Sequence, residues 1–395
     1  MPDATTDAPS EGSTGTDAMS DAASDGDVWV AEAGPDSSET GPEAGPDAGE
    51  AGHEAGEAGP DAGEAGPEAG EGNIIIADQF NNRVIEIDRQ GHIVWQFGNG
   101  NAKPGPMSVV GPNDVERLPN GQTLISGTGV PAAAAGTSTG DPACDAVDAG
   151  AAGCPDNRVL LVGADGGISW VYGANGELNA PVFAAMTANG HVLITDQGNN
   201  RIVEVAADGG VAWQFGPLPD GGSLLNNPNS AQRLPSGDTL IADEGANRVI
   251  QVQGDGGIGW QYGLTPDGGA VLSAPAFASR LPSGNTLIDD SGHNRVLEVD
   301  TQGTVVWSYV TTSRYAADAG SANPTPTRAV RLANGNTLIS DQFNHQVFEI
   351  DHASPPNVVF SFGQLNVAGN GAGQLNAPYD AKLVGDFTGL TIPPQ

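Results

Sequence analysis

The feature of this 395-residue sequence that most constrains its fold is an internal repeat. A tryptophan recurs at positions 95, 170, 213, 260 and 307, and a phenylalanine takes the sixth place at position 360. The intervals are 75, 43, 47, 47 and 53 residues. A period near 45 residues is typical of β-propeller blades, in which each unit is a small antiparallel sheet that stacks on its neighbours.

One unit can be divided into four short strands: "PAFASRL" (275–281), "NTLIDD" (285–290), "RVLEVD" (295–300) and "TVVWSY" (304–309). The segments are of strand length and rich in β-branched residues, and small residues with glycine separate the first from the second, as tight hairpins require. No segment keeps an apolar period of 3.6 residues, so essentially no helix is expected. The sequence therefore predicts an all-β, six-bladed β-propeller.

The first unit lacks its innermost strand, because it begins directly at "NIIIADQ" (73–79). The missing strand occurs at the far end of the chain as "APYDAKLV" (377–384). We expect this C-terminal strand to complete the first blade, which closes the ring and removes exposed sheet edges. The predicted propeller spans residues 73–390 and carries an insertion at 128–156.

Residues 1–72 contain 19 acidic and no basic residues among Ala, Gly, Pro and Ser, and they predict a disordered tether because they cannot bury enough apolar surface to fold. The rest of the chain has 30 acidic and 14 basic residues without a basic stripe. This balance argues against nucleic acid as a partner. No apolar run is long enough for a membrane span, so we expect no insertion into a membrane. We also expect a monomer.

The insertion contains both cysteines of the chain, Cys144 and Cys154. Two cysteines this close in a Gly/Ala-rich loop predict a disulfide, which favours an oxidising compartment; two free thiols in a cytosolic loop are the alternative. The acidic tether also resembles the mature N-termini of bacterial surface lipoproteins, which implies an upstream signal beyond Met1. We therefore expect an extracytoplasmic location, at the cell surface, in the periplasm or secreted, with lipid anchoring as one form of it.

An Asp-x-x-x-Asn-Arg motif follows the second strand of four units, and an active site is rarely built four times over. We interpret the motif as turn chemistry, in which the Asp accepts loop N–H groups and pairs with the Arg. The sixth unit differs, and the insertion replaces the loop in the second, so these two loops are free to do something else. The motif residues are Asp78/Asn82/Arg83, Asp196/Asn200/Arg201, Asp243/Asn247/Arg248 and Asp290/Asn294/Arg295, with Asp341/His345/Gln346 in the sixth unit.

Two further repeating residues are also interpreted as structural. The tryptophans alternate with apolar residues on the fourth strand, so we expect them to pack between blades. Four arginines near the ends of the innermost strands should pair with acidic neighbours at the opposite rim; they are Arg117, Arg233, Arg280 and Arg331.

Segments such as "IADQFNNRVIEID" and "ITDQGNNRIVEVAADGG" resemble NHL repeats, and the resemblance covers residues 73 to about 384. The Asp-x-x-Gly-x-x-x-Trp element, as in 300–307, also resembles the blade-docking motif of quinoprotein dehydrogenases. NHL propellers include peptide-, protein- and RNA-binding modules as well as lyases, so the resemblance implies architecture more than activity.

Two function classes follow. The favoured one is an extracytoplasmic binding or scaffold module for a protein, glycan or small-molecule ligand, because no histidine or carboxylate cluster predicts catalysis. The alternative is a secreted propeller enzyme, a lyase, hydrolase or quinone-dependent oxidoreductase, with its site in the central funnel.

A ligand in the funnel would contact residues that differ between blades just after the proline that starts each innermost strand. Two of them, Asp114 and Asp380, belong to adjacent blades and could share Ca²⁺, the one cofactor that the sequence suggests. The alternative is that these groups bond neighbouring loops and channel water. The candidate ligand-binding residues are Asn113, Asp114, Phe183, Asn229, Ser230, Phe277, Thr327, Arg328, Tyr379 and Asp380.

Overall fold

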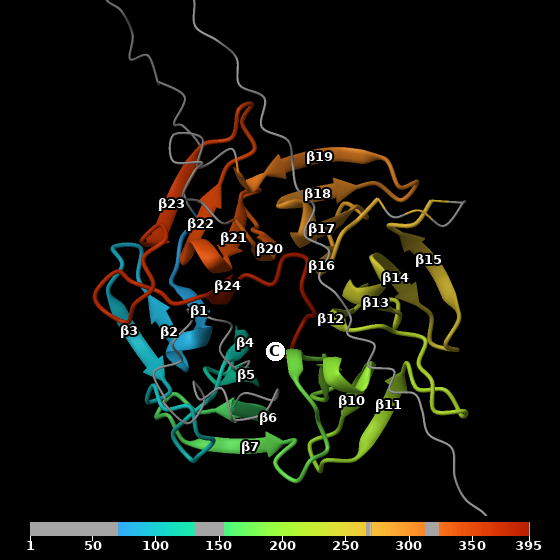
Figure 1. Cartoon of the computed structure of the whole chain (residues 1–395), viewed down its shortest axis with the longest axis horizontal. Coiled ribbons are helices and arrows are strands. Elements are labelled where there is room, and N and C mark those ends of the chain that lie inside the picture. Colours follow the sequence, from blue (N-terminus) through green and yellow to red (C-terminus); the bar gives the residue numbers. More distant parts are fainter. Residues whose placement is uncertain (1–69, 131–153, 266–268, 270, 313–323, 395) are drawn as a thin grey trace, which may run out of the picture. The chain divides into compact units, whose positions relative to one another are not determined.

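The computed structural model describes residues 70–130, 154–265, 269, 271–312 and 324–394. They form six four-stranded antiparallel sheets around a central axis, so the predicted all-β, six-bladed propeller is confirmed (Figure 1). Most of the predicted tether, residues 1–69, lies outside the described residues. So does Cys144, and the disulfide with Cys154 stays a prediction.

Each blade is a meander of four strands, counted from the axis outward. Blade 1 is β24 (Pro378–Leu383), β1 (Ile74–Asp78), β2 (Arg83–Ile87) and β3 (Ile93–Phe97), and blade 2 is β4 (Pro112–Arg117), β5 (Thr123–Val130), β6 (Cys154–Val162) and β7 (Ile168–Tyr172). Blade 3 is β8 (Pro181–Met186), β9 (Val192–Asp196), β10 (Arg201–Val205) and β11 (Val211–Phe215), and blade 4 is β12 (Pro228–Arg233), β13 (Thr239–Asp243), β14 (Arg248–Val252) and β15 (Ile258–Tyr262). Blade 5 is β16 (Pro275–Arg280), β17 (Thr286–Asp290), β18 (Arg295–Val299) and β19 (Val305–Val310), and blade 6 is β20 (Pro326–Arg331), β21 (Thr337–Asp341), β22 (Gln346–Ile350) and β23 (Val358–Gly363).

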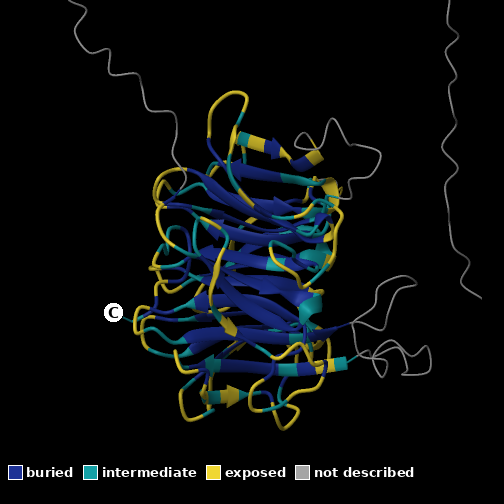
Figure 2. Cartoon of the chain, turned by 90° about the vertical axis from the view of Figure 1, so that its left-hand side faces the viewer, coloured by how far each residue is buried: buried dark blue, intermediate teal, exposed yellow. Residues whose placement is uncertain are grey.

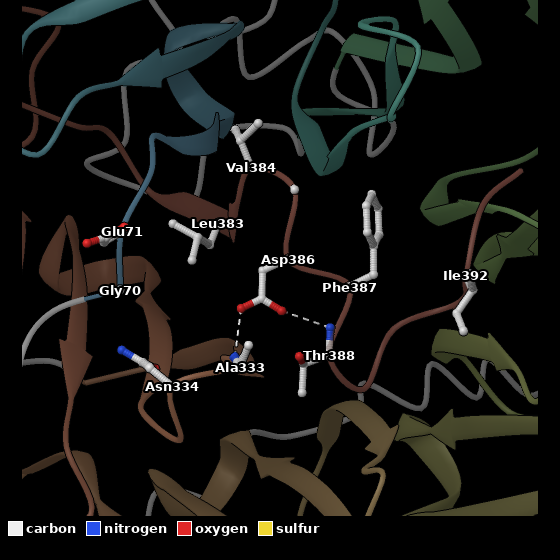
Figure 3. Close-up of a pocket in the computed structure, with 11 residues that line it drawn as sticks. Gly70, Glu71, Ala333, Asn334, Leu383, Val384, Asp386, Phe387, Thr388 and Ile392 are labelled. Atoms are coloured by element: carbon white, nitrogen blue, oxygen red, sulfur yellow. Dashed lines mark hydrogen bonds between the residues drawn. The ribbon is translucent and has the colours of Figure 1, made fainter. Parts of the chain in front are cut away.

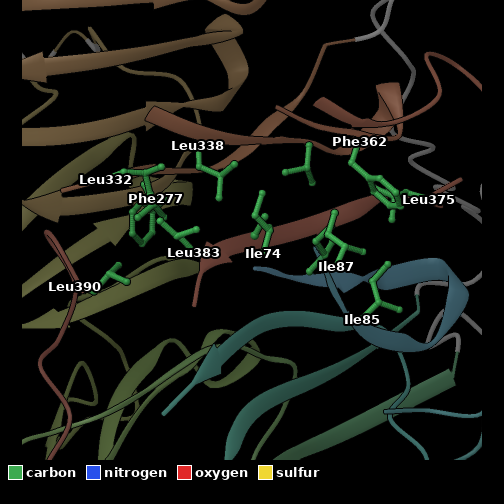
Figure 4. Close-up of a cluster of buried hydrophobic side chains, with 14 of the residues drawn as sticks. Ile74, Ile85, Ile87, Phe277, Leu332, Leu338, Phe362, Leu375, Leu383 and Leu390 are labelled. Carbon is green, nitrogen blue, oxygen red and sulfur yellow. The ribbon is translucent and has the colours of Figure 1, made fainter. Parts of the chain in front are cut away.

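The ring closes as predicted, because β24 pairs antiparallel with β1, with Ile74 opposite Leu383. Apolar residues of adjacent blades then pack together, as where Ile85 and Ile87 of blade 1 meet Leu338 and Phe362 of blade 6 (Figure 4). Seen from the side, the inner strands are buried, and the exposed residues gather in the turns at both ends and on the outermost strands (Figure 2). Closure therefore leaves two faces and the outer strands for contact with other molecules.

The two faces differ in their connections. The face that we call the loop face carries the links between blades and the turns between second and third strands. Among the described residues these turns include five short 3-10 segments: η1 (Gln79–Asn81), η2 (Gln197–Asn199), η3 (Glu244–Ala246), η4 (Ser291–His293) and η6 (Gln342–Asn344). The opposite face, the hairpin face, carries the other turns and the end of the chain.

The Asp-x-x-x-Asn-Arg motif is structural, as predicted, and it joins blades. In blade 4 the Asp243 carboxylate accepts a bond from Arg248 Nε at 2.8 Å and one from the backbone N–H of Asn226, just before the blade's own innermost strand. Asn247 has left-handed backbone angles, with φ of 53°, and its Oδ1 accepts the N–H of Ala274 at 2.8 Å, before the innermost strand of blade 5. The same motif thus fixes the start of two neighbouring blades.

Blades 2 and 6 keep this arrangement, which corrects the expectation that their loops are free. In blade 2 the roles pass to Asp156 and Asn157, which accept the N–H groups of Val110 and Ala180. In blade 6 His345 replaces the asparagine, and its Nδ1 accepts the N–H of Ala377 at 3.0 Å. The bonds are retained because each innermost strand needs its first N–H groups held, whatever the local sequence.

Tryptophan and arginine side chains join the blades at the hairpin face. Arg117 lies over the Trp95 ring at 4.3 Å and binds Glu86 at 2.6 Å, both from blade 1. Arg233 and Arg331 repeat the contact with Glu204 and Glu298. Arg280 differs, because its partner is the neutral Gln251. The expected inter-blade role of these residues is confirmed, with one amide in place of an acid.

Replacing Asn247 with Ala should lower the free energy of unfolding by about 2 kcal/mol, because Ala274 N–H loses its acceptor and Ala is strained at positive φ. Asn247→Gly, the matched control, loses the bond but not the backbone freedom, and should cost less. Guanidinium unfolding of the full chain measures both. Equal stability of all three proteins would show that the contact between blades 4 and 5 does not depend on this bond.

Candidate functional site

The ten residues named from the sequence all lie on the innermost strands and surround the central channel in two layers. The layer at the loop face consists of Asn113, Asn229, Thr327 and Tyr379. The layer below it consists of Asp114, Phe183, Ser230, Phe277, Arg328 and Asp380. All are buried except Tyr379, which is partly exposed. The structure therefore brings the predicted residues together around one channel.

Tyr379 crosses the mouth of the channel. Its hydroxyl accepts a bond from Asn229 Nδ2 at 2.8 Å, and this joins blade 1 to blade 4 on the opposite side of the ring. Thr327 Oγ1 donates to the Tyr379 carbonyl and holds its backbone. Burial, followed by the nearby Glu244 carboxylate, raises the pKa of Tyr379. The phenol therefore stays neutral and acts as a bar across the channel.

A chain of amides continues around the mouth. Gln79 donates to Asn113 Oδ1 at 2.6 Å and accepts from Gln342 Nε2 at 2.7 Å, so blades 1, 2 and 6 are linked. Gln197 and Asn229 both donate to Glu244 Oε2. Sequence reasoning missed these first residues of the 3-10 turns, although Gln or Glu follows the motif aspartate at four of the five turns named above.

Below the mouth, Lys382 joins the two carboxylates for which calcium was considered. Its Nζ donates to Asp114 Oδ1 at 2.8 Å, to Asp380 Oδ2 at 2.7 Å and to the Val115 carbonyl at 2.8 Å. Burial raises the pKa of Asp114 to about 6. Burial acts on Asp380 in the same sense, but the charges of Lys382 and Arg328 outweigh it and lower its pKa. The ammonium group is thus fully bonded between two buried carboxylates.

This arrangement does not fit a calcium ion. Calcium needs six to eight oxygen ligands, whereas Lys382 and Arg328 already balance the charge of Asp114 and Asp380. Among the described residues, no group of three or more His, Cys, Asp or Glu side chains could hold a metal ion. The calcium site that the sequence suggested therefore has no support from the structure, and we expect calcium not to bind between Asp114 and Asp380.

Arg328 fills the centre of this layer. It is fully buried, with its guanidinium 4.7 Å from the Phe277 ring centroid and 5.2 Å from that of Phe183. Its Nε lies 3.3 Å from Asp380 Oδ1, outside hydrogen-bond geometry. Asp289 on β17 is also fully buried, and desolvation raises its pKa well above the usual range. Sequence reasoning missed Asp289, although the equivalent positions carry Ala, Ser or Thr, namely Ala77, Ser126, Thr195, Ala242 and Ser340.

The end of the chain covers the channel at the hairpin face. Residues 384–394, which we call the strap, leave β24 in blade 1 and pass blade 6, where the Asp386 carboxylate accepts the N–H of Ala333 at 2.7 Å (Figures 1 and 3). The strap then reaches blade 4, where Thr391 Oγ1 accepts the N–H of Arg233 at 3.0 Å. Leu390, between these two points, is buried against the channel.

Three grooves border the strap. One of about 710 Å³ lies between the strap, Gly70–Glu71 and the Ala333–Asn334 turn of blade 6 (Figure 3). Others of about 460 and 210 Å³ lie beside Trp95 and beside Leu234. Under Leu390 the channel retains a small enclosed cavity of about 10 Å³, which Glu116 and Lys382 help to line. The strap therefore divides the open space of the hairpin face from the interior of the channel.

Fold and site define a six-bladed β-propeller whose channel is filled by its own side chains. The family model described as outer membrane protein assembly factor BamB matches residues 155–357, about half of the sequence. The chain belongs to this family of PQQ_2 repeat propellers, which agrees with the NHL-like architecture expected from the sequence. No curated protein matches the chain.

Solved structures share the fold at low identity. A protein of unknown function from Bacteroides caccae is 14% identical, with 74% of this chain and 93% of that chain covered and a TM-score of 0.50. Virginiamycin B lyase from Staphylococcus aureus is 16% identical, with coverage of 66% and 75% and a TM-score of 0.44. A streptogramin B lyase is 15% identical, with coverage of 76% and 82% and a TM-score of 0.48. None of these likenesses assigns an activity to this chain.

Replacing Lys382 with Met should leave Asp114 and Asp380 buried without their shared partner. Both carboxyls would then have higher pKa values in the folded state than in the unfolded chain. The variant should therefore lose stability as the pH rises from the unfolded-state pKa values through the folded-state ones. We expect a loss of about 3 kcal/mol at pH 8 and a smaller one at pH 5, where the carboxyls protonate more easily. Urea unfolding at the two pH values measures it, and a loss independent of pH would contradict the ion triad.

Calcium should leave the melting temperature of the wild type unchanged, because the ammonium of Lys382 takes the position between the carboxylates. Thermal unfolding with calcium and with a chelator tests this. A rise with calcium that the Asp114→Asn/Asp380→Asn double variant lacks would establish the metal site that the sequence suggested. Asparagine is chosen because its amide oxygen keeps an acceptor for the hydrogen bonds of Lys382 Nζ, which alanine would remove.

Proposed function

We propose that this chain is an extracytoplasmic binding or scaffold module that engages a protein partner through its outer surface. The observation that carries the proposal is the filled channel. Tyr379 bars the mouth, the layer of Arg328 and Lys382 occupies the middle, and Leu390 covers the far end. A propeller enzyme needs reactive groups open to its substrate, whereas Arg328 and Lys382 are buried and the hydroxyl of Tyr379 is bonded to Asn229.

The family supports a protein partner and a place in the cell envelope. An outer membrane protein assembly factor, as the matching model is described, acts on other proteins at the outer membrane. We extend this kind of role to the present chain, without its particular partners. Among the described residues, no helix is long and apolar enough to cross a bilayer.

The outermost strands are the surface best suited to such a partner. On β19, Val305, Val306 and Val310 have exposed fractions of 45%, 52% and 45%. As the outermost strand of its sheet, β19 also has one edge without a neighbouring strand in that sheet. An open edge with apolar side chains can accept an extended segment of a partner, because main-chain hydrogen bonds and side-chain contacts then form together.

A ligand in the channel remains the second part of the proposal, at the ten residues predicted from the sequence. The geometry requires that Tyr379 first leave Asn229, because its side chain crosses the mouth. Phe183 and Phe277, with ring centroids 6.3 Å apart, would form the apolar side of that site.

The experiment places a photo-crosslinking amino acid at Val306 of the full chain in native host cells. The matched control position is Gln302, an exposed residue in the turn that precedes β19. We expect the protein to fractionate with the envelope and Val306, but not Gln302, to crosslink a discrete envelope protein. Val306→Lys should weaken that complex at least tenfold, since a charge would enter the apolar contact.

Two results would contradict the proposal. A cytoplasmic location would remove its compartment. Equal crosslinking from both positions, with no effect of Val306→Lys, would show that β19 does not recognise a partner. Tyr379→Phe removes the hydrogen bond to Asn229 and leaves β19 unchanged. It should therefore alter the binding of a ligand in the channel and leave crosslinking from Val306 unchanged.

A further inference from the structure

The far end of the channel has a buried polar atom without a hydrogen-bond partner, beside a small cavity whose walls are mainly apolar. The cavity beneath the strap is lined by Phe183, Ala185, Phe277 and Leu390, with Gln232 and Glu116 among its polar residues. Glu116 is 3% exposed, and its Oε2 has no hydrogen-bond partner. A buried carboxyl oxygen left unbonded is unfavourable, so the cavity lacks a group that would complete it.

The neighbouring charges do not supply that group. Lys382 directs its three donors to Asp114, Asp380 and the Val115 carbonyl. Burial, the largest effect, raises the pKa of Glu116 to about 8, so its carboxyl is protonated at neutral pH and can donate a hydrogen bond. The cavity of about 10 Å³ holds about one water molecule while the strap is closed. A larger occupant must therefore displace the strap.

The strap has the features of a displaceable cover. Two hydrogen bonds described above tie the strap to the blades: the Asp386 carboxylate accepts the N–H of Ala333, and Thr391 Oγ1 accepts the N–H of Arg233. Leu390 is its buried apolar anchor, whereas Ile392, two residues on, is 52% exposed. The grooves on both sides give the segment room to move. Each innermost strand, in contrast, is held by a series of backbone pairs to the second strand of its blade.

We propose that this end of the channel is a binding site for a small uncharged molecule with an aliphatic or aromatic body and one hydroxyl or carbonyl oxygen, and that the strap is its displaceable cap. Leu390 occupies the place of the ligand's body, at the cavity that Phe183 and Phe277 also line. The ligand's oxygen accepts the hydrogen bond of Glu116. An uncharged ligand fits because Lys382, Arg328, Asp114 and Asp380 already balance one another. This inference is independent of the protein partner proposed for β19.

The probe is 3-methyl-1-butanol, which joins a leucine-like body to one hydroxyl, and every variant is made in the full chain. Leu390→Gly empties the site, and Ile392→Gly is the matched control in the same strap. We expect millimolar probe to raise the melting temperature of Leu390→Gly by several degrees, and to leave Ile392→Gly indistinguishable from the wild type. Adding Glu116→Leu to Leu390→Gly should weaken probe binding about tenfold, whereas Glu116→Gln, which keeps a donor, should retain it.

Hydrogen exchange in the wild type tests the proposal without any change of the sequence. Hydrogen exchange at the amides of Leu390 and Ile392 should accelerate when the probe is added, while the innermost strands keep their protection. The proposal is overturned if Leu390→Gly folds but binds no probe, or if Glu116→Leu binds it equally well. If the probe does not change hydrogen exchange at the strap amides of the wild type, the strap is a fixed part of the fold and not a displaceable cap.

Discussion

The rest of the structure depends on hydrogen bonds from side chains to the backbone at the start of each innermost strand. The Asp of one blade and the Asn of the preceding blade accept neighbouring N–H groups there, as Asp243 and Asn200 do for Asn226 and Asn227. These bonds satisfy N–H groups at the ends of the strands and set the spacing between blades. Their persistence through Asp156 and Asn157 in blade 2 shows that the ring requires the bond and tolerates changes in how the sequence supplies it.

One strand, β24, both closes the ring and supplies charged side chains to the channel. β24 pairs with β1 and also carries Asp380 and Lys382, so the last segment of the chain completes both the first blade and the buried ion triad. Two cations and two carboxylates buried from solvent are stable only when all four are present. The channel is therefore a structural core, and the surfaces that can recognise other molecules are the outer strands, the mouth at Tyr379 and the strap.

Part of the site could be predicted because propeller repeats separate scaffold from variation. Positions that differ between blades identified Asp114, Arg328 and Tyr379, and the assignment of β24 to blade 1 predicted that Asp114 and Asp380 belong to adjacent blades. Lys382 escaped prediction because it lies two residues farther along β24 than Asp380, at a position that we did not compare between blades. Its contact with both carboxylates changes their chemistry from a possible metal site to an ion triad.

The sequence by itself determined the number of blades, the strands and the closing strand, because they follow from a repeat with six units. It also determined the structural nature of the Asp-x-x-x-Asn-Arg motif, because that motif recurs in four of the units. Tertiary structure alone decided that Tyr379 reaches Asn229 across the ring, that Lys382 lies between two carboxylates and that Leu390 covers Glu116. These contacts join residues that are distant in the sequence and occur once each. No repeat reports them, and they arise only when six blades converge on one axis.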